Sequence, residues 1–166
     1  MAEALFITTT DIKKFTVIDG NVSNDKFIQF IEIAQAIHIQ NVIGTDLYEK
    51  LQSEITGATL TGAYETLVET YIKPALIYWA LYEYLPFAPY TVGNKGIFKH
   101  TSEAAVVADK DEVHEMREAS QKTANYYTTR LLSYLCANES SFPEYKTNTD
   151  GDVYPAGDIN YGNWFL

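Results

Sequence analysis

The chain has 166 residues, of which 46% are hydrophobic and 20% are charged, a composition typical of one ordinary globular domain and not of a disordered chain. Its formal net charge of −10 argues against tight binding to nucleic acids, because affinity for phosphates comes mainly from Lys and Arg. The one cysteine, Cys136, leaves no intramolecular disulfide and no zinc site built on cysteines. It falls in a helical stretch, where we expect a small core residue.

Aromatic residues are frequent, with 13 Tyr, 8 Phe and 2 Trp, and Tyr and Trp suit wet interfaces as well as cores. Residues 1–6 lack the basic and apolar regions of a secretory signal. The most apolar run, residues 74–90, is interrupted by a glutamate and two prolines and falls short of the roughly 20 residues that a membrane helix needs. We therefore expect a soluble protein, without membrane contact, that folds in a reducing cytoplasm.

Residues 1–23 predict an extended N-terminal arm with one short helical turn near residues 10–15, because their apolar positions fit a helical period poorly. Such an arm either packs on its own domain or is donated to a neighbouring subunit. We predict that Leu5, Phe6 and Ile7 form an inter-subunit contact.

Two helices are expected next. The first begins at an N-cap, Ser23 or Asn24, and its apolar residues recur at the 3.6-residue period until Gly44 ends it. A short second helix follows Thr45. The third, over residues 61–85, is amphipathic at first and apolar nearly all round after Pro74, so we expect it to be buried and kinked at the proline.

The fourth and longest helix should begin at the N-cap Asp109 and end near Asn138. Between the third and fourth helices, residues 90–108 contain two β-prone runs around a Gly-rich turn, which predicts a β-hairpin or a long projecting loop. An isolated hairpin is marginally stable in water. We therefore predict that Ile97 and Phe98 contact another subunit.

Residues 143–166 combine turn signals with an aromatic end. Exposing each large apolar side chain to water costs roughly 1.5–3 kcal/mol relative to burying it. We predict that the tail binds a partner; the alternative is that it folds back over its own helices. The partner-binding residues would be Tyr154, Tyr161, Trp164, Phe165 and Leu166.

The sequence indicates no catalytic or metal-binding residues. None of His38, His100 and His114 lies beside a recognisable nucleophile; His38 is expected to be a hydrogen-bonded structural residue, and His114 to lie on a solvated charged face. Residues 148–152 resemble a calcium loop only loosely, because the glycine is misplaced and the distal glutamate is missing. We predict no enzyme activity, no metal and no cofactor.

Several segments follow one another in an order that resembles a known family. They are Asp11–Thr16, Asp19–Val22, Ala34–Ile39, Ile43–Tyr48, Lys73–Pro74, Asn94–Gly96 and Thr101–Glu103. In this order, over about residues 5–145, the chain resembles the small head-to-tail connector (ring or adaptor) proteins of tailed phages, especially crAss-like phages. The tail after Phe142 has no counterpart in this resemblance.

The resemblance implies a helical protomer repeated in a closed ring, commonly of twelve copies, docked beneath the portal protein. Adjacent ring or tail proteins would lie below it, and DNA would pass through the lumen without specific binding. The subunit would assemble in the host cytoplasm and end in the neck of the virion.

We therefore expect a mainly α structural subunit: a bundle of about four helices (residues 24–142) with a hairpin insertion at about 90–108, an N-terminal arm (1–23) and a C-terminal tail (143–166). A tail-completion or tail-terminator protein, a small hydrolase acting on cell wall or nucleic acid, and a monomeric regulatory module are the alternatives.

Overall fold

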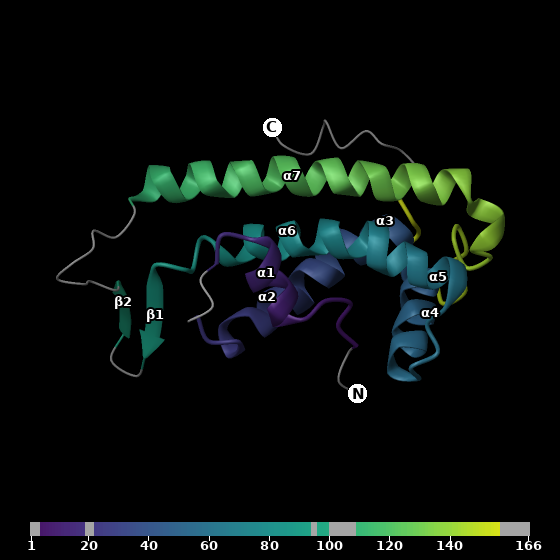
Figure 1. The fold of residues 1–166 in the computed structure, drawn as a ribbon, viewed down its shortest axis with the longest axis horizontal. Coiled ribbons are helices and arrows are strands. Elements are labelled where there is room, and N and C mark those ends of the chain that lie inside the picture. Colours follow the sequence, from purple (N-terminus) through teal and green to yellow (C-terminus); the bar gives the residue numbers. More distant parts are fainter. Residues whose placement is uncertain (1–3, 19–21, 94–95, 100–108, 157–166) are drawn as a thin grey trace.

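The computed structural model is mainly helical, and its 28-residue helix α7 (Lys110–Ala137) lies along α6 (Lys73–Tyr84) (Figure 1). It describes residues 4–18, 22–93, 96–99 and 109–156, with the side chains of 91–93 and 96–99 left out. The other elements are α1 (Thr9–Phe15), α2 (Asp25–Ala34), the π-helical turn η1 (Gln35–Gln40), α3 (Asn41–Ile43), α4 (Thr45–Thr56), α5 (Gly62–Thr66), the π-helical turn η2 (Leu67–Ile72), β1 (Tyr90–Gly93), β2 (Gly96–Lys99) and the 3-10 turn η3 (Glu139–Ser141).

The first two predicted helices are confirmed. α2, η1 and α3 follow one another without a break over residues 25–43, and α4 begins at Thr45. Gly44 separates them with a φ of 82° and a ψ of 158°, a conformation that only glycine adopts readily. A Cβ atom at Gly44 would lie 2.6 Å from Cδ of Pro155. The glycine therefore both turns the chain and lets the C-terminal part of the chain approach.

The third predicted helix consists of α5, η2 and α6. Pro74 has no N–H group, so it cannot donate a hydrogen bond to the carbonyl one turn earlier in the helix. The chain accommodates the proline with the π-helical turn η2 directly before α6. Six residues of α6 are buried, in agreement with its apolar character on nearly every side: Ala75, Leu76, Ile77, Trp79, Ala80 and Leu81.

Helix α7 begins where its capping residues predict. The carboxylate of Asp109 accepts hydrogen bonds from the backbone N–H groups of Asp111 and Glu112, both at 2.9 Å. The Glu112 carboxylate in turn accepts from the backbone N–H of Asp109 at 2.9 Å, which completes a capping box. Because both ends of this exchange are acidic, the cap also suits the positive end of the helix dipole.

The predicted hairpin is confirmed for residues 90–93 and 96–99, and the rest of the predicted insertion lies outside the described residues. β1 and β2 pair in antiparallel register from Tyr90↔Lys99 to Gly93↔Gly96, beyond the end of the α6–α7 pair (Figure 1). The side chains of Ile97 and Phe98 lie outside the described part, so their inter-subunit contact stays a prediction.

The N-terminal residues pack on their own subunit. Phe6 and Ile7 are each only 2% exposed, and Leu5 is half-buried against the same core. The buried amide of Gln35 ties this segment down: its Oε1 accepts from the backbone N–H of Phe6 at 2.8 Å, and its Nε2 donates to the carbonyl of Ala4 at 2.9 Å. The prediction of an inter-subunit contact is therefore wrong for Phe6 and Ile7, which are core residues of the subunit.

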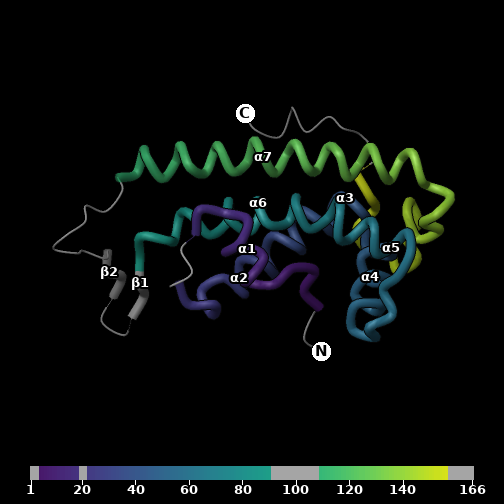
Figure 2. The backbone as a smooth tube through the Cα atoms, in the orientation of Figure 1, coloured from purple at the N-terminus to yellow at the C-terminus, as the bar shows by residue number. Residues whose placement is uncertain are grey.

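Residues 143–156, the C-terminal strap, also fold back on the helices (Figure 2). Tyr145 is buried in the core, the N–H of Thr45 donates to the carbonyl of Val153 at 3.0 Å, and the N–H of Ala156 donates to the carbonyl of Asn41 at 3.0 Å. For these residues the fold-back alternative is right, and the helical domain extends beyond the expected boundary at residue 142.

Candidate assembly surfaces

Aromatic side chains join α6 and η2 to α7. The rings of Tyr71 and Tyr134 stack with centroids 4.0 Å apart, and those of Tyr78 and Tyr127 stack at 5.8 Å. The partners run in opposite chain directions, so the two helices are antiparallel. These four tyrosines hold the helices in register along one edge of their contact, and their rings are only half-buried there.

The half-buried tyrosines are part of a larger surface. Tyr126, which is 60% exposed, meets the edge of Tyr127 at 5.3 Å, and the Arg130 guanidinium lies over the Tyr71 ring at 5.8 Å. Tyr71, Tyr126, Arg130 and Tyr134 also line a shallow groove of about 350 Å³. We call the set Tyr71, Tyr78, Tyr126, Tyr127, Arg130 and Tyr134 the tyrosine surface. Exposed Tyr and Arg are the residue types that dominate binding energy at protein interfaces.

A second apolar surface lies on the outer side of α2 and η1. Ile28, Ile33 and Ile37 are 40%, 41% and 49% exposed, outside the buried stripe of Phe27, Ile31 and Ala34. Exposed Glu32 and Ala36 complete it. We call Ile28, Glu32, Ile33, Ala36 and Ile37 the isoleucine face. Single exposed apolar residues are common, but here three exposed isoleucines occur within ten residues of one helical segment, and Ile33 and Ile37 lie four residues apart on the same side, as in a contact surface.

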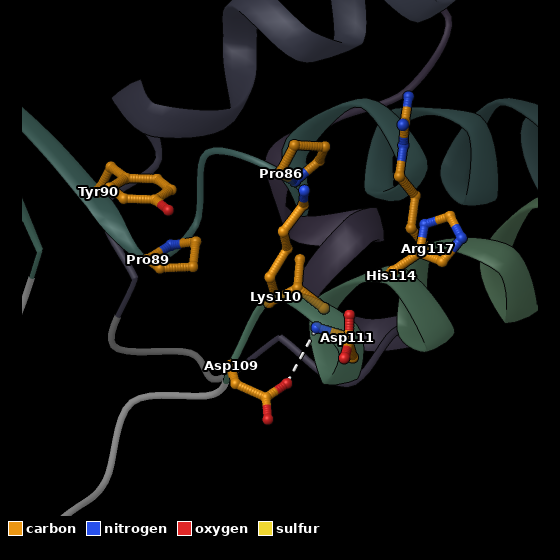
Figure 3. A pocket seen from close by; sticks show the side chains of 9 residues that line it. Pro86, Pro89, Tyr90, Asp109, Lys110, Asp111, His114 and Arg117 are labelled. Atoms are coloured by element: carbon orange, nitrogen blue, oxygen red, sulfur yellow. Dashed lines mark hydrogen bonds between the residues drawn. The ribbon is translucent and has the colours of Figure 1, made fainter.

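A cleft of about 600 Å³ lies at the base of the hairpin, between the end of α6 and the start of α7 (Figure 3). Three of its polar side chains have partners. Asp109 caps α7, His114 pairs with Glu118 at 3.3 Å, and the Arg117 guanidinium lies 4.0 Å from the centre of the Tyr82 ring. The described lining residues include no serine, threonine or cysteine, so they offer no hydroxyl or thiol nucleophile of those types.

His38 has the hydrogen-bonded position that its sequence context predicts. Its Nε2 lies 2.8 Å from Oε1 of Glu83 and links η1 to α6. Its ring stacks on Trp79 at 3.7 Å with only 4° between the planes, and the Trp79 Nε1–H donates to Oγ1 of Thr128 at 3.0 Å. This chain of contacts joins three helical elements. His100 lies outside the described residues.

The acidic side chains near the strap hold it to α4. Asp46 accepts from the hydroxyls of Thr147 and Thr149 at 2.6 Å and 2.7 Å, and these hydrogen bonds lower the pKa of its carboxyl below the ordinary value of 3.8. Asp152 accepts from the Thr45 hydroxyl at 2.9 Å. Nowhere in the described part of the chain do three or more His, Cys, Asp or Glu side chains gather around a possible metal position.

Two further predictions have different outcomes. Cys136 is exposed and not a core residue, because α7 turns Leu131, Leu132 and Leu135 toward the core at this level. Tyr154 is 55% exposed on the strap and is available to a partner. The other predicted partner-binding residues, Tyr161, Trp164, Phe165 and Leu166, lie outside the described residues.

Neither of these surfaces was predicted from the sequence. Tyr127 and Tyr134 share one face of α7 with the buried residues Ala124 and Leu131, so their spacing resembles that of core residues. Tyr126 could have indicated the surface, because it lies outside that helix face and its aromatic ring is therefore directed outward. Ile33 was a similar signal, because it interrupts the period of Phe27, Phe30, Ile31 and Ala34.

Comparison with known families gives a match over residues 39–155 to a family of unknown function, DUF6712. The chain belongs to this family. The DUF6712 match runs from η1 to the strap and includes every residue of the tyrosine surface. No curated protein and no solved structure matches the chain. Among the described helices of this DUF6712 protein, none is both long and apolar enough to cross a membrane.

Proposed function

We propose that this DUF6712 protein is a non-enzymatic assembly subunit that forms a homo-oligomeric ring in the neck of a tailed phage. The ring joins the portal protein to the adjacent ring or tail proteins and lets DNA pass. The observation that supports this proposal best is the tyrosine surface, since it exposes aromatic rings and a guanidinium on the two helices that form the centre of the fold.

The physical argument is one of burial. An exposed tyrosine has a large apolar face that gains free energy when a partner covers it, while its hydroxyl remains satisfied at a wet interface. The chain presents the isoleucine face in addition, on different helices. A net charge of −10 also suits a conduit, because an acidic wall does not retain DNA phosphates.

Electron microscopy of the purified full chain, alone and mixed with portal protein, tests this function. We expect closed rings that stack on the portal. Particles of single-subunit size in both samples would contradict the proposal. Rings that bind tail tubes and leave the portal free would favour the tail-terminator alternative.

The end of the chain is still predicted to contact a partner. Because the strap is held in place up to residue 156, the role of the residues after it can be tested separately. Ala156 is held by the carbonyl of Asn41, so a variant ending at residue 156 retains every described contact of the strap. We expect this variant to keep the helical circular dichroism signal and to lose binding to the portal or the next ring. Unchanged binding would show that residues 157–166 do not form the contact.

A further inference from the structure

The two apolar surfaces differ in charge. The tyrosine surface contains one charged group, Arg130, and the isoleucine face contains one, Glu32. The ion pairs of the described residues involve neither of them. In the described part of the chain, the Arg130 guanidinium lies over the ring of Tyr71. The chain therefore presents one cationic and one anionic apolar surface.

The two surfaces also lie on different sides of the fold. α7 lies on one side of α6 and α2 on the other (Figure 1), and α2 buries Phe27 and Ile31 while its isoleucines face outward. The surfaces share no residue and lie on different helices. The helices that carry them pack on α6. Both can therefore be covered at the same time.

Ring closure requires two different faces on each subunit, because a surface that pairs with its own copy ends the assembly at a dimer. Pairing like surfaces here would bring two Arg130 side chains or two Glu32 side chains together, and like charges oppose such contacts. Pairing unlike surfaces brings a guanidinium to a carboxylate and aromatic rings to aliphatic side chains.

We propose that the tyrosine surface of one copy docks on the isoleucine face of the next copy, with Arg130 beside Glu32 of that copy. This inference rests on the proposed ring and adds which surfaces make it. The occupant of each surface is a second copy of the chain, and the contact is head-to-tail.

Two variants, each damaged on one surface, test this arrangement. Tyr126→Asp damages the tyrosine surface, and Ile33→Asp damages the isoleucine face; both residues are exposed, so circular dichroism should show an intact fold. We expect each variant alone to stay monomeric in sedimentation velocity. An equal mixture should form a one-to-one dimer, because only one intact pair of surfaces remains. Met116→Asp, at an apolar position on α7 that is 43% exposed and belongs to neither surface, serves as the control and should form rings.

Charge exchange gives the second measurement. Arg130→Glu and Glu32→Arg should each weaken ring formation, and the double variant should restore it. Self-association of the Ile33→Asp variant alone would show that the tyrosine surface pairs with itself and would overturn the proposal. A mixture that stays monomeric, or single variants that still form wild-type rings, would overturn it as well. If the wild type forms rings and one of these contrary results is obtained, only the assignment of the surfaces is refuted. If the wild type itself is monomeric, the ring is refuted.

Discussion

At the scale of single residues, Trp79 connects the core to two neighbouring elements. Its indole N–H donates to the Thr128 hydroxyl on α7, and its ring stacks on His38 of η1. Thr128 is buried and its own hydroxyl donates to the carbonyl of Ala124 at 2.9 Å. A buried donor that loses its acceptor still carries the full free-energy cost of its removal from water, with no hydrogen bond to offset it. The stability of the α6–α7 contact therefore depends on this hydroxyl.

Replacing Thr128 with Val keeps the shape of the side chain and leaves the Trp79 N–H without its acceptor. We expect the free energy of unfolding, measured with urea, to fall by about 1–3 kcal/mol. Thr129→Val is the matched control, because Thr129 bonds the carbonyl of Asn125 in the same way but is exposed. Its effect should be small, and equal losses in the two variants would contradict the role given to Trp79.

Asp46 makes the strap sensitive to acid. Its pKa is lowered in the folded chain, mainly by hydrogen bonds from Thr147 and Thr149, so folding favours the charged carboxylate. Its contribution to stability is present above the unfolded value near 3.8 and is lost as pH falls through the lower folded pKa.

In Asp46→Asn, we expect a lower melting temperature than the wild type at neutral pH and a difference that shrinks below about pH 4. Thermal melts across this range measure it. Asp150→Asn, an exposed carboxylate of the same strap, should show no such difference. A gap between wild type and Asp46→Asn that persists in acid would contradict the account.

Not all of these residue roles could be predicted. The position of His38 on an apolar helix face indicated a structural hydrogen bond. The partners of Asp46, by contrast, lie 101 and 103 residues away in the sequence, and no local spacing reveals them. Cys136 was misplaced because its neighbours on both sides along α7 are apolar, and only packing decides which of them faces inward.

At the scale of elements, the helices were predictable because their ends carry local signals. Asp109 caps α7 through its own side chain, and Gly44 stops the helix before α4. The strap carried no such signal. Some of its attachments use the backbone groups of Val153 and Ala156, which any residue offers. Its side-chain hydrogen bonds to Asp46 and Thr45 join residues more than 100 positions apart, so the sequence did not show that it folds back. The N-terminal segment was ambiguous for the same reason.

The close approach of the strap to Gly44 gives a prediction for this element. Gly44→Ala imposes a conformation unsuited to alanine and a Cβ 2.6 Å from Pro155, so we expect urea unfolding to show a loss of about 2–4 kcal/mol. Gly62→Ala also has a positive φ, of 62°, but meets no atom within 4 Å and should cost only about 1 kcal/mol. Equal losses would mean that Pro155 is not packed on Gly44.

At the scale of the whole molecule, the aromatic residues divide between two tasks. Trp79 and Phe142 fill the core, whereas Tyr126 and its neighbours extend from the core to the surface along the α6–α7 contact. The composition predicted an interface-forming protein, and the resemblance to phage connectors predicted a ring. Neither could locate the surface, because the sequence places tyrosines on helices without showing which rings a single subunit leaves uncovered.

Self-association of the chain is the central claim, and sedimentation equilibrium of the full chain over a wide range of micromolar concentrations tests it most directly. The subunit mass is 18.7 kDa. We expect a weight-average mass that rises with concentration and levels off at an integer multiple of this value. A mass that stays at 18.7 kDa up to the highest concentration would contradict the account.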